Sequence, residues 1–250
     1  MIDLSKPYPF GLSRRNWPLF AWGFAAILFG LLLVDHPLSL LASNQTQQVT
    51  QFFAEVTRWG ESDWILYPSL ALLVLSALVA WAIPKRIPKL ALIEMSQMYG
   101  FIFLGVGLPG LAANLLKRII GRTRPDFFAN GGTLGLHTLA NNYHYESFPS
   151  GHATTAFAAA MVLGFLSPRW FAVGLIYAVA ICLSRVELGV HYPTDVFGGI
   201  VLGVLGAYAV RDAFAKRRWG FERLPSGAIV RRDAVAVQRL IRPRQRKLAV

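Results

Sequence analysis

The sequence contains six long apolar stretches, each close to the length that a helix needs to cross a lipid bilayer. That length is about 20 residues, with about 17–25 as the working range. Two of the stretches, from Ala153 and from Trp170, are short, so we expect their helices to extend into flanking polar residues. The sequence therefore predicts an all-α integral membrane protein, a bundle of six transmembrane helices. The stretches run from Trp17 to Val34, Trp64 to Ile83, Met95 to Leu116, Ala153 to Leu166, Trp170 to Ser184 and Pro193 to Val210.

The composition favours a membrane protein over the other classes that a basic chain suggests. Of the 250 residues, 54% are apolar and 15% are charged, and the formal net charge is +12. Soluble domains carry about 25% charged residues. A strongly basic chain often binds nucleic acid, but here the arginines are spread over a tail without a recognition motif, so we expect no nucleic-acid partner.

The positive charges predict the side of the membrane on which each connection lies. The N-terminal segment, the second and fourth connections and the C-terminal tail hold 19 of the 25 Lys and Arg residues, and the other side holds 6. Since cytoplasmic loops collect Lys and Arg, both termini are predicted to be cytoplasmic. We divide the chain into a transmembrane domain, residues 1–214, and a basic cytoplasmic tail, residues 215–250. We expect the tail to be solvated, with binding to anionic lipid as the alternative.

Three polar segments fall on the predicted outer side. They are residues 117–125, which leave the third span, residues 149–152, which enter the fourth, and residues 184–195, which join the fifth and sixth. Clustered charges at a membrane boundary are functional candidates because an unpaired charge there is costly. We therefore expect one active site at the outer, or periplasmic, interface.

Three cations in these segments predict a phosphate-binding site. Lys117, Arg124 and Arg185 lack an equal set of nearby carboxylates in the sequence. A phosphate would balance them, since a guanidinium can grip two phosphate oxygens at once. Two neighbours, Arg118 and Arg122, are instead expected to lie at the interface and to set the topology.

The remaining polar residues can carry out chemistry at phosphorus. Ser150 and Gly151 precede a run of small residues, so we expect them in the first turn of a helix, where free N–H groups and the helix dipole bind anions. Asp195 follows His191 by four residues. Its carboxylate can reach back to Nδ1 and leave Nε2 free as a nucleophile or base. His152 supplies a second imidazole, which can protonate a leaving oxygen.

These residues form a pattern that resembles a known family. The sequence reads K-x6-R-P from Lys117, P-S-G-H from Pro149 and S-R-x5-H-x3-D from Ser184. This is the three-part signature of the type 2 phosphatidic acid phosphatase family, which also includes lipid phosphate phosphatases, glucose-6-phosphatase and vanadium haloperoxidases. All three parts are present in order and with the family's spacing. The resemblance implies a membrane lipid phosphatase without a metal or another cofactor.

The resemblance also implies a role for each residue of the signature. His191, oriented by Asp195, would attack phosphorus and form a phosphohistidine. His152 would protonate the leaving oxygen, and water would then release phosphate. The residues that would bind the phosphate and stabilise its pentacoordinate transition state are Lys117, Arg124, Ser150, Gly151 and Arg185.

The substrate is predicted only as a class. The resemblance implies a lipid phosphate or diphosphate in a bacterial cytoplasmic (inner) membrane, of the undecaprenyl diphosphate, phosphatidylglycerophosphate, phosphatidic acid or lipid A type. A phosphotransferase that uses the same histidine is the nearest alternative, and a lipid or phosphate transporter is the alternative from another class. An enzyme is favoured because the ionisable residues gather at one face instead of within the spans. The oligomeric state stays open.

Other features leave more than one interpretation open. A metal site is the rival explanation for the histidines, although the chain has neither H-E-x-x-H nor C-x-x-C. Residues 127–148 are expected to form a lid or a headgroup-selecting wall, with a disordered connector as the alternative. Within them, we expect His137 and His144 to be solvated. Apolar residues at helical spacing from Val49 to Trp59 predict an amphipathic helix, either on the outer interface or packed on the bundle.

Overall fold

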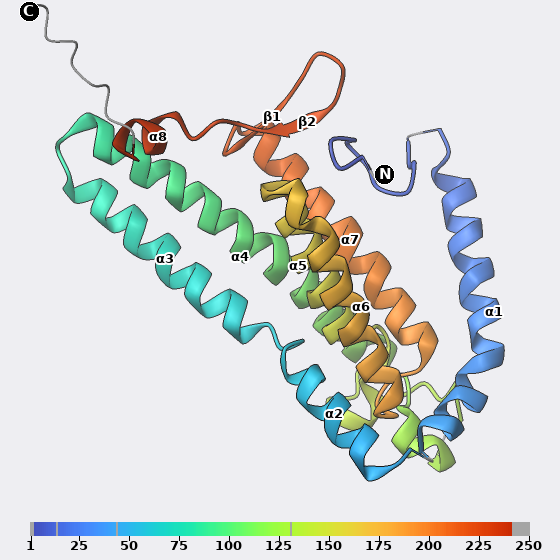
Figure 1. The fold of residues 1–250 in the computed structure, drawn as a ribbon. Coiled ribbons are helices and arrows are strands. Elements are labelled where there is room, and N and C mark those ends of the chain that lie inside the picture. Colours follow the sequence, from blue (N-terminus) through green and yellow to red (C-terminus); the bar gives the residue numbers. More distant parts are fainter. Residues whose placement is uncertain (1–2, 14, 44, 131, 242–250) are drawn as a thin grey trace, which may run out of the picture.

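The computed structural model describes residues 3–13, 15–43, 45–130 and 132–241, most of them in helices. The N-terminal segment and a small sheet lie at one end of the bundle, and α2 lies at the other end (Figure 1). Three short 3₁₀ helices occur in the connections, at Pro125–Asn130, Tyr143–Tyr145 and Pro168–Trp170. The remaining elements are α1 (Trp17–Ser43), α2 (Gln47–Arg58), α3 (Asp63–Ala82), α4 (Arg86–Ile120), α5 (Gly151–Leu166), α6 (Phe171–Glu187), α7 (Pro193–Lys216), α8 (Val235–Ile241), β1 (Phe221–Arg223) and β2 (Ile229–Arg231).

Every predicted span is helical, which confirms the helical membrane fold. Among the described residues, five helical segments are long and apolar enough to cross a membrane, and they contain α1, α3, α4, α6 and α7. The apolar helix α5 has 16 residues, so the count of six spanning helices stays a prediction. As expected for the two short stretches, α5 begins at Gly151 and α6 continues to Glu187. The polar segments therefore reach into the helix ends.

Two glycines on α7 bring this helix against α5. A Cβ at Gly199 would lie 2.5 Å from the carbonyl oxygen of Ser150, and a Cβ at Gly203 would overlap the carbonyl oxygen of Thr154. Both neighbours are backbone atoms, which cannot turn away as a flexible side chain can. Small residues four apart are a common means of close helix packing in lipid. Here they fix the distance between α7 and the start of α5.

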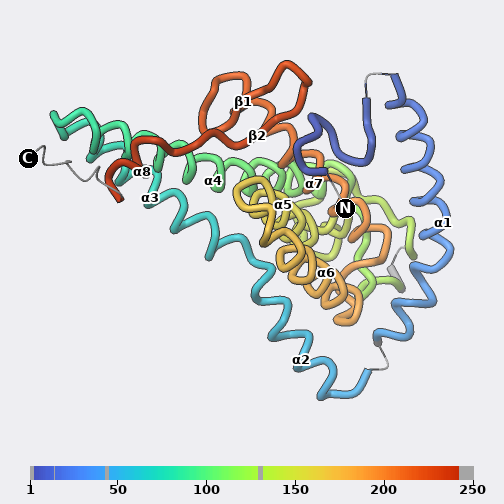
Figure 2. Tube along the Cα trace, turned by 45° about the horizontal axis from the view of Figure 1, so that its top comes forward, coloured from blue at the N-terminus to red at the C-terminus, as the bar shows by residue number. Residues whose placement is uncertain are grey.

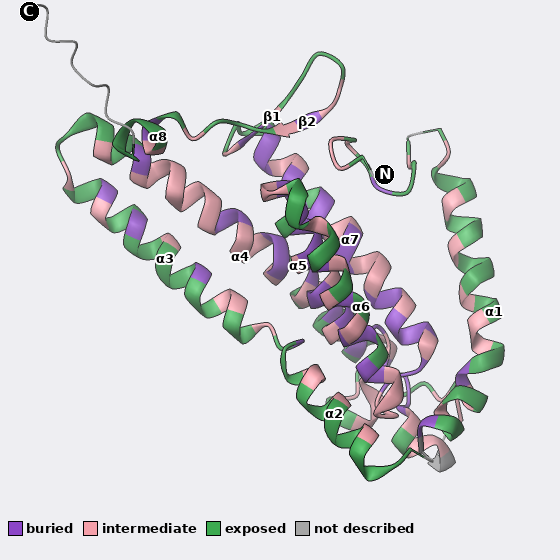
Figure 3. Ribbon diagram, viewed as in Figure 1, coloured by how far each residue is buried: buried purple, intermediate pink, exposed green. Residues whose placement is uncertain are grey.

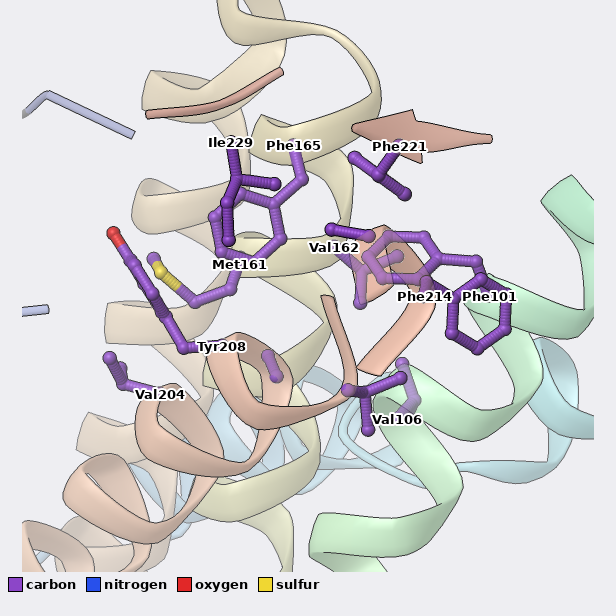
Figure 4. Packing of buried hydrophobic residues seen from close by; sticks show 13 residues of the cluster. Phe101, Val106, Met161, Val162, Phe165, Val204, Tyr208, Phe214, Phe221 and Ile229 are labelled. Atoms are coloured by element: carbon purple, nitrogen blue, oxygen red, sulfur yellow. The ribbon is translucent and has the colours of Figure 1, made fainter. Parts of the chain in front are cut away.

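The main hydrophobic core lies between α4, α5 and α7 and extends to the sheet (Figure 4). Phe101 of α4 joins the helices to the sheet, with its ring centroid 4.5 Å from that of Phe221 in β1 and 5.4 Å from that of Phe214 in α7. Aromatic pairs at such distances add about 0.5–1.5 kcal/mol beyond their buried area. The core therefore packs the helices together at the end of the bundle that carries the sheet. The polar segments lie at the opposite end.

The described part of the tail is folded and packed on the bundle, whereas we expected a solvated tail. The strands pair antiparallel, and each contributes one buried apolar residue to the core, Phe221 and Ile229. The first N–H groups of α8 donate to the carboxylate of Glu94 in α4, at 3.1 Å from Ala236 N to Oε2. Counting arginines in the tail overlooked these apolar positions. Residues 242–250 lie outside the described residues.

Helix α1 stands at the side of the bundle, next to α7, and exposes most of its surface (Figures 2 and 3). In its most apolar 18-residue window, 0% is buried, as expected for a helix that faces lipid. Phe24 stacks on Phe197 of α7 with ring centroids 5.4 Å apart. Near the end of α1, Asp35 is completely buried, and Ala42 is buried as well. Helix α2 packs on α6 without burying any residue.

Candidate active site

The three polar segments meet at one end of the bundle, as the sequence predicts. Residues 117–125 continue from α4, residues 149–152 begin α5, and residues 184–195 join α6 to α7. The backbone N–H of Ser150 donates to the carbonyl oxygen of Asp195 at 2.9 Å, and that of His191 donates to the carbonyl oxygen of Arg185 at 3.2 Å. These bonds tie the start of α5 and the end of α6 to the α6–α7 connection.

Local sequence signals fix each of these turns. Gly121 ends α4 with a left-handed backbone, φ +65°, which glycine adopts without strain. The hydroxyl of Ser150 caps α5 by accepting the N–H of Ala153 at 3.5 Å. Pro193 occupies the first position of α7, where its missing N–H has no consequence. The prediction of helix starts at Ser150 and Pro193 is confirmed.

Residues 127–148 fold back over the end of α4. The N–H of His137 donates to the carbonyl oxygen of Gly121 at 2.7 Å, and the N–H of Arg124 donates to that of His144 at 2.8 Å. His137 is exposed, as expected. The expectation for His144 was wrong: it is half-buried, with Nδ1 shielded from solvent, because it stacks on Phe127 with ring centroids 4.5 Å apart. The segment is therefore a folded wall beside the polar residues.

We expect Gly121→Ala to loosen this wall. A methyl group at position 121 would overlap the carbonyl oxygen of His137. Gly132→Ala is the matched control, because its φ is also positive, +63°, but nothing lies within 4 Å of its Cβ. Both variants bear a backbone cost of about 1–2 kcal/mol, and only Gly121→Ala adds the clash. Thermal unfolding in detergent should show the larger fall in Tm for Gly121→Ala, and equal falls would contradict this role.

His191 and Asp195 are buried together, and the carboxylate faces Nδ1, as the four-residue spacing predicts. Nδ1 of His191 lies 3.5 Å from Oδ2 of Asp195, which is long for a hydrogen bond, although such contacts often tighten when substrate binds. Among the described residues, Nδ1 has no hydrogen-bond partner within the usual geometry. Burial, opposed by the carboxylate of Asp195, lowers the pKa of His191 well below its usual range. The imidazole is therefore neutral near pH 7 and able to act as a nucleophile.

The carboxylate of Asp195 is held from several sides. Its Oδ1 accepts from Nη1 of Arg122 at 2.6 Å. Its Oδ2 accepts from the hydroxyl of Ser147 at 2.5 Å and from the backbone N–H of Tyr192 at 2.8 Å. These hydrogen bonds fix the orientation of the carboxylate, so that Oδ2 faces the imidazole of His191.

The three predicted cations are near one another. The charge of Lys117 is repelled by those of Arg124 and Arg185, and its Nζ lies 3.4 Å from where a Cβ of Gly151 would be. Lys117 therefore faces the amino end of α5. Nη1 of Arg185 donates to the hydroxyl of Thr57, in the last turn of α2, and the two atoms are 2.6 Å apart. Nε of Arg185 is buried without a partner, so the guanidinium still has donors to offer an anion.

Arg124 makes hydrogen bonds within the protein that the sequence did not suggest. Its guanidinium donates to the carbonyl oxygens of Tyr143 (2.8 Å), Val190 (3.0 Å) and Glu146 (3.2 Å). It also stacks on the ring of Tyr143, 3.9 Å from the centroid. A guanidinium has five N–H donors, so some remain for a ligand. Arg124 also joins the wall to the α6–α7 connection.

A cavity of about 430 Å³ between α3, α4 and α5 reaches His152 and Lys117. His152 lies in the first turn of α5 and within reach of the positive charges of Lys117, Arg124 and Arg185. Gly60 closes the cavity beside it, because a Cβ there would lie 2.8 Å from Cδ2 of His152. Apolar side chains from α3 and α4 line the part away from the cations, namely Leu66, Val106 and Leu111. The cavity thus has one cation, Lys117, and an apolar wall, and its lining also includes the acidic residues Glu61 and Asp63.

Our expectation for Arg122 was wrong. We placed it at the membrane interface, but its side chain is 5% exposed and bonds to Asp195, Asp35 and Thr194. Burial disfavours its charge, but the two carboxylates outweigh burial and raise the pKa of Arg122. The functional candidates that the sequence analysis missed are Asp35, Arg122, Ser147 and Thr194. The one signal for Asp35 was a carboxylate directly after an apolar span.

The chain is similar in sequence to known membrane phosphatases. Residues 99–219 match the family model described as PAP2 superfamily. A lipid A 1-phosphatase of Rhizobium johnstonii is 32% identical over 202 residues, 81% of this chain and 82% of that protein. An undecaprenyl-diphosphatase of Sulfolobus acidocaldarius is 30% identical over 165 residues, 66% of this chain and 70% of that protein.

The fold is similar to that of a solved membrane phosphatase. The solved structure is the crystal structure of the first transmembrane PAP2 type phosphatidylglycerolphosphate phosphatase from Bacillus subtilis, with a TM-score of 0.51 and 25% sequence identity. The similarity covers 78% of this chain and 95% of that one. The signature from Lys117 to Asp195 lies inside the matched region. The chain belongs to the PAP2 superfamily.

Proposed function

We propose that this membrane protein is a lipid phosphatase that transfers the phosphate of its substrate to His191 and then to water. The observation that carries the proposal is the arrangement at the polar end of the bundle. Three cations, Lys117, Arg124 and Arg185, and the amino end of α5 lie beside a buried histidine that a carboxylate faces. Several relatives of the chain are phosphatases by name, including the lipid A 1-phosphatase and the undecaprenyl-diphosphatase above.

In the first step, Nε2 of neutral His191 attacks phosphorus. A nitrogen–phosphorus bond forms as the bond from phosphorus to the lipid oxygen breaks. Burial and the neighbouring cations lower the pKa of His152 to about 3 in the free protein, so we propose that the negative charge of the bound phosphate lets His152 hold the proton that it gives to the leaving oxygen. Lys117 and Arg185 neutralise the charge that develops on the phosphoryl oxygens, together with the free N–H groups of Ser150 and Gly151 at the start of α5. Asp195 stabilises the positive charge on the phosphorylated imidazole.

In the second step, water attacks the phosphohistidine. His152, now neutral, takes a proton from the water as its oxygen bonds to phosphorus. The nitrogen–phosphorus bond breaks, neutral His191 is restored and inorganic phosphate leaves. A lipid hydroxyl in place of water would make the same site a phosphotransferase, which is the second candidate activity.

We propose that neither step needs a metal ion. The positive charge that a metal would provide is supplied by Lys117, Arg124 and Arg185. Within the described ranges, no three His, Cys, Asp or Glu side chains come together as metal ligands. Fixed cations in a water-poor site can supply transition-state stabilisation on the order of 10²–10³ in rate per contact.

The substrate that we propose is a lipid phosphomonoester or diphosphate. Lipid A with a 1-phosphate is the first candidate, because two relatives that match 81% of this chain are lipid A 1-phosphatases. Undecaprenyl diphosphate, phosphatidylglycerophosphate and phosphatidic acid are the others. The cavity beside His152 offers the cation Lys117 and an apolar wall of Leu66, Val106 and Leu111, which suits a phosphate carried by an apolar lipid.

The test is phosphate release from a panel of these four lipids by the purified protein in detergent, with EDTA present. We expect release from at least one lipid at the same rate with and without EDTA, and a loss on the order of 10²–10³ for Arg185→Gln. Arg118→Gln is the matched control, since Arg118 is exposed. Loss of activity in EDTA would contradict metal independence, and no release from any lipid would contradict the phosphatase. Transfer to an added acceptor lipid without phosphate release would identify the phosphotransferase.

The low pKa of His191 gives a prediction about its protonation. A pKa well below 6.5 means that the ring is neutral above that value and gains a proton only as the pH falls further. We expect the ¹⁵N spectrum of histidine-labelled protein to show a neutral His191 throughout about pH 6–8. The resonance is assigned by its loss in His191→Asn. An imidazolium spectrum at neutral pH would contradict the assignment of His191 as nucleophile.

We also propose that the protein lies in a bacterial inner membrane with both termini in the cytoplasm and the site outside. The 19 Lys and Arg residues on the side of the termini support this orientation. Because Cys182 is buried, single cysteines can report sidedness. A membrane-impermeant maleimide added to spheroplasts should label His137→Cys, in the wall, and leave Ser226→Cys, between β1 and β2, unlabelled. The reverse pattern would contradict the orientation.

A further inference from the structure

The most unusual charge outside the proposed reaction is Asp35, in the helix that otherwise faces lipid. It is completely buried. Its Oδ2 accepts from Nη2 of Arg122 at 2.7 Å and from the hydroxyl of Thr194 at 2.6 Å, and its Oδ1 accepts from the backbone N–H of Thr194 at 3.1 Å. A carboxylate within a membrane helix is costly unless it is paired. Here the partners belong to the segments that build the site.

Arg122 connects this carboxylate to the histidine's carboxylate. Its Nη1 donates to Oδ1 of Asp195 at 2.6 Å and to the hydroxyl of Thr194 at 2.5 Å. Its Nε donates to the carbonyl oxygen of Thr133 at 2.9 Å, and its guanidinium lies 4.4 Å from the centroid of the Tyr192 ring. The side chain is thus fixed in one position, between two carboxylates that come from different helices.

The charges of this cluster explain why two carboxylates are useful. A single guanidinium bonded to Asp195 would cancel the negative charge that His191 needs when its ring becomes positive. The charge of Asp35 offsets that of Arg122, so the cluster of three side chains keeps a net charge of −1 next to Nδ1 of His191. A buried ion pair contributes little net stability, because desolvation opposes it. A role in the reaction is the better explanation for keeping three charges there.

We propose that Asp35 is a positioning residue of the phosphatase: through Arg122 it fixes the carboxylate of Asp195 and preserves its charge for the phosphorylated form of His191. This inference rests on the proposed function. It makes α1, which lies outside the matched family region, part of the machinery that supports the reaction. Asp35 itself touches neither the substrate nor the reacting atoms.

The test is a steady-state comparison of wild type with Asp35→Asn in detergent, on the lipid that wild type hydrolyses fastest. We expect kcat to fall about 10- to 100-fold, as is typical when a group that orients a reacting residue is removed, with KM changed by less than about twofold. Asp212→Asn is the matched control, because it breaks ion pairs with Lys216 and Arg223 at the other end of the bundle. We expect its kcat to equal that of wild type.

A double-mutant cycle separates charge balance from simple loss of structure. If Asp35 acts through Arg122, then Asp35→Asn combined with Arg122→Gln should reduce kcat no more than the more damaging single change does. A fall equal to the product of the two single effects would overturn the proposal. So would an Asp35→Asn variant with the kcat of wild type, or one in which KM alone changes.

Two further results keep the test decisive. Should Asp35→Asn fail to accumulate as folded protein, Thr194→Val replaces it, because this change removes hydrogen bonds to Asp35 and Arg122 but no charge. A wild-type kcat for Thr194→Val would then overturn the proposal. If the wild type itself releases no phosphate from any lipid of the panel, the proposed function has failed. If the wild type is active and the Asp35 variant is equally active, only this inference has failed.

Discussion

The His191→Asn variant is expected to release phosphate on the order of 10⁴–10⁶ times more slowly than the wild type, which is the range seen when an enzyme loses its nucleophile. Asparagine is polar and smaller than histidine, so it can occupy the buried position beside Asp195 without a new clash. It offers no imidazole nitrogen to attack phosphorus. The measurement is inorganic phosphate released from the best lipid of the panel, with enzyme in excess so that a single slow turnover can be detected.

The matched control is His137→Asn, in the wall. That imidazole is exposed and lies against the ring of Tyr145, 4.1 Å between centroids. We expect this variant to keep the activity of the wild type. Activity of His191→Asn within about tenfold of the wild type would exclude a phosphohistidine at this residue, since a nucleophile contributes far more than that.

The second large effect is expected for a change that adds one methyl group and alters no charge. Gly199→Ala would place a Cβ 2.5 Å from the carbonyl oxygen of Ser150 and 3.0 Å from the Cβ of Ala153. The start of α5 must then move away from α7 by about 1 Å. A displacement of this size between reacting groups lowers the rate about 10²-fold, because the N–H groups at the start of α5 and His152 move relative to His191.

Gly100→Ala in α4 is the matched control for this substitution. Its new methyl group would lie 3.6 Å from the nearest atom, Cδ1 of Leu73, which is ordinary contact. Alanine also favours a helix by about 1 kcal/mol over glycine, so the control should be as stable as the wild type or slightly more stable. Phosphate release and thermal unfolding should be measured for both variants. Equal kcat values would contradict the account of α5–α7 packing.

The sequence was sufficient to predict the parts of this protein that follow local rules. The apolar stretches have a required length in a bilayer, so each helix could be located, although α1 ends nine residues after the predicted stretch and α4 begins nine residues before it. Ser150 and Pro193 are strong signals for helix starts. Because α7 begins between His191 and Asp195, the carboxylate lies in the first turn of this helix and faces back toward the imidazole. The three polar segments could be brought to one end because successive spans alternate in direction.

Contacts between distant segments could not be predicted in the same way. Arg122 has the sequence context of an interfacial cation, and only the fold brings it between Asp35, 87 residues earlier, and Asp195, 73 residues later. The same applies to the tail, where single apolar residues in β1 and β2 complete a core built from α4, α5 and α7. A sequence reveals such partners only through their chemistry, and the one sign here, overlooked at first, was a carboxylate directly after an apolar span.

The central claim is tested most directly by trapping the intermediate. The wild type is mixed with a ³²P-labelled lipid phosphate, quenched within the first turnover in alkaline detergent and separated from lipid. We predict label covalently bound to the protein, stable in alkali and lost in acid, as a phosphohistidine requires, and no label on His191→Asn. Label that survives acid, label of equal amount on the variant, or an active wild type that carries no label at any quench time would contradict the account.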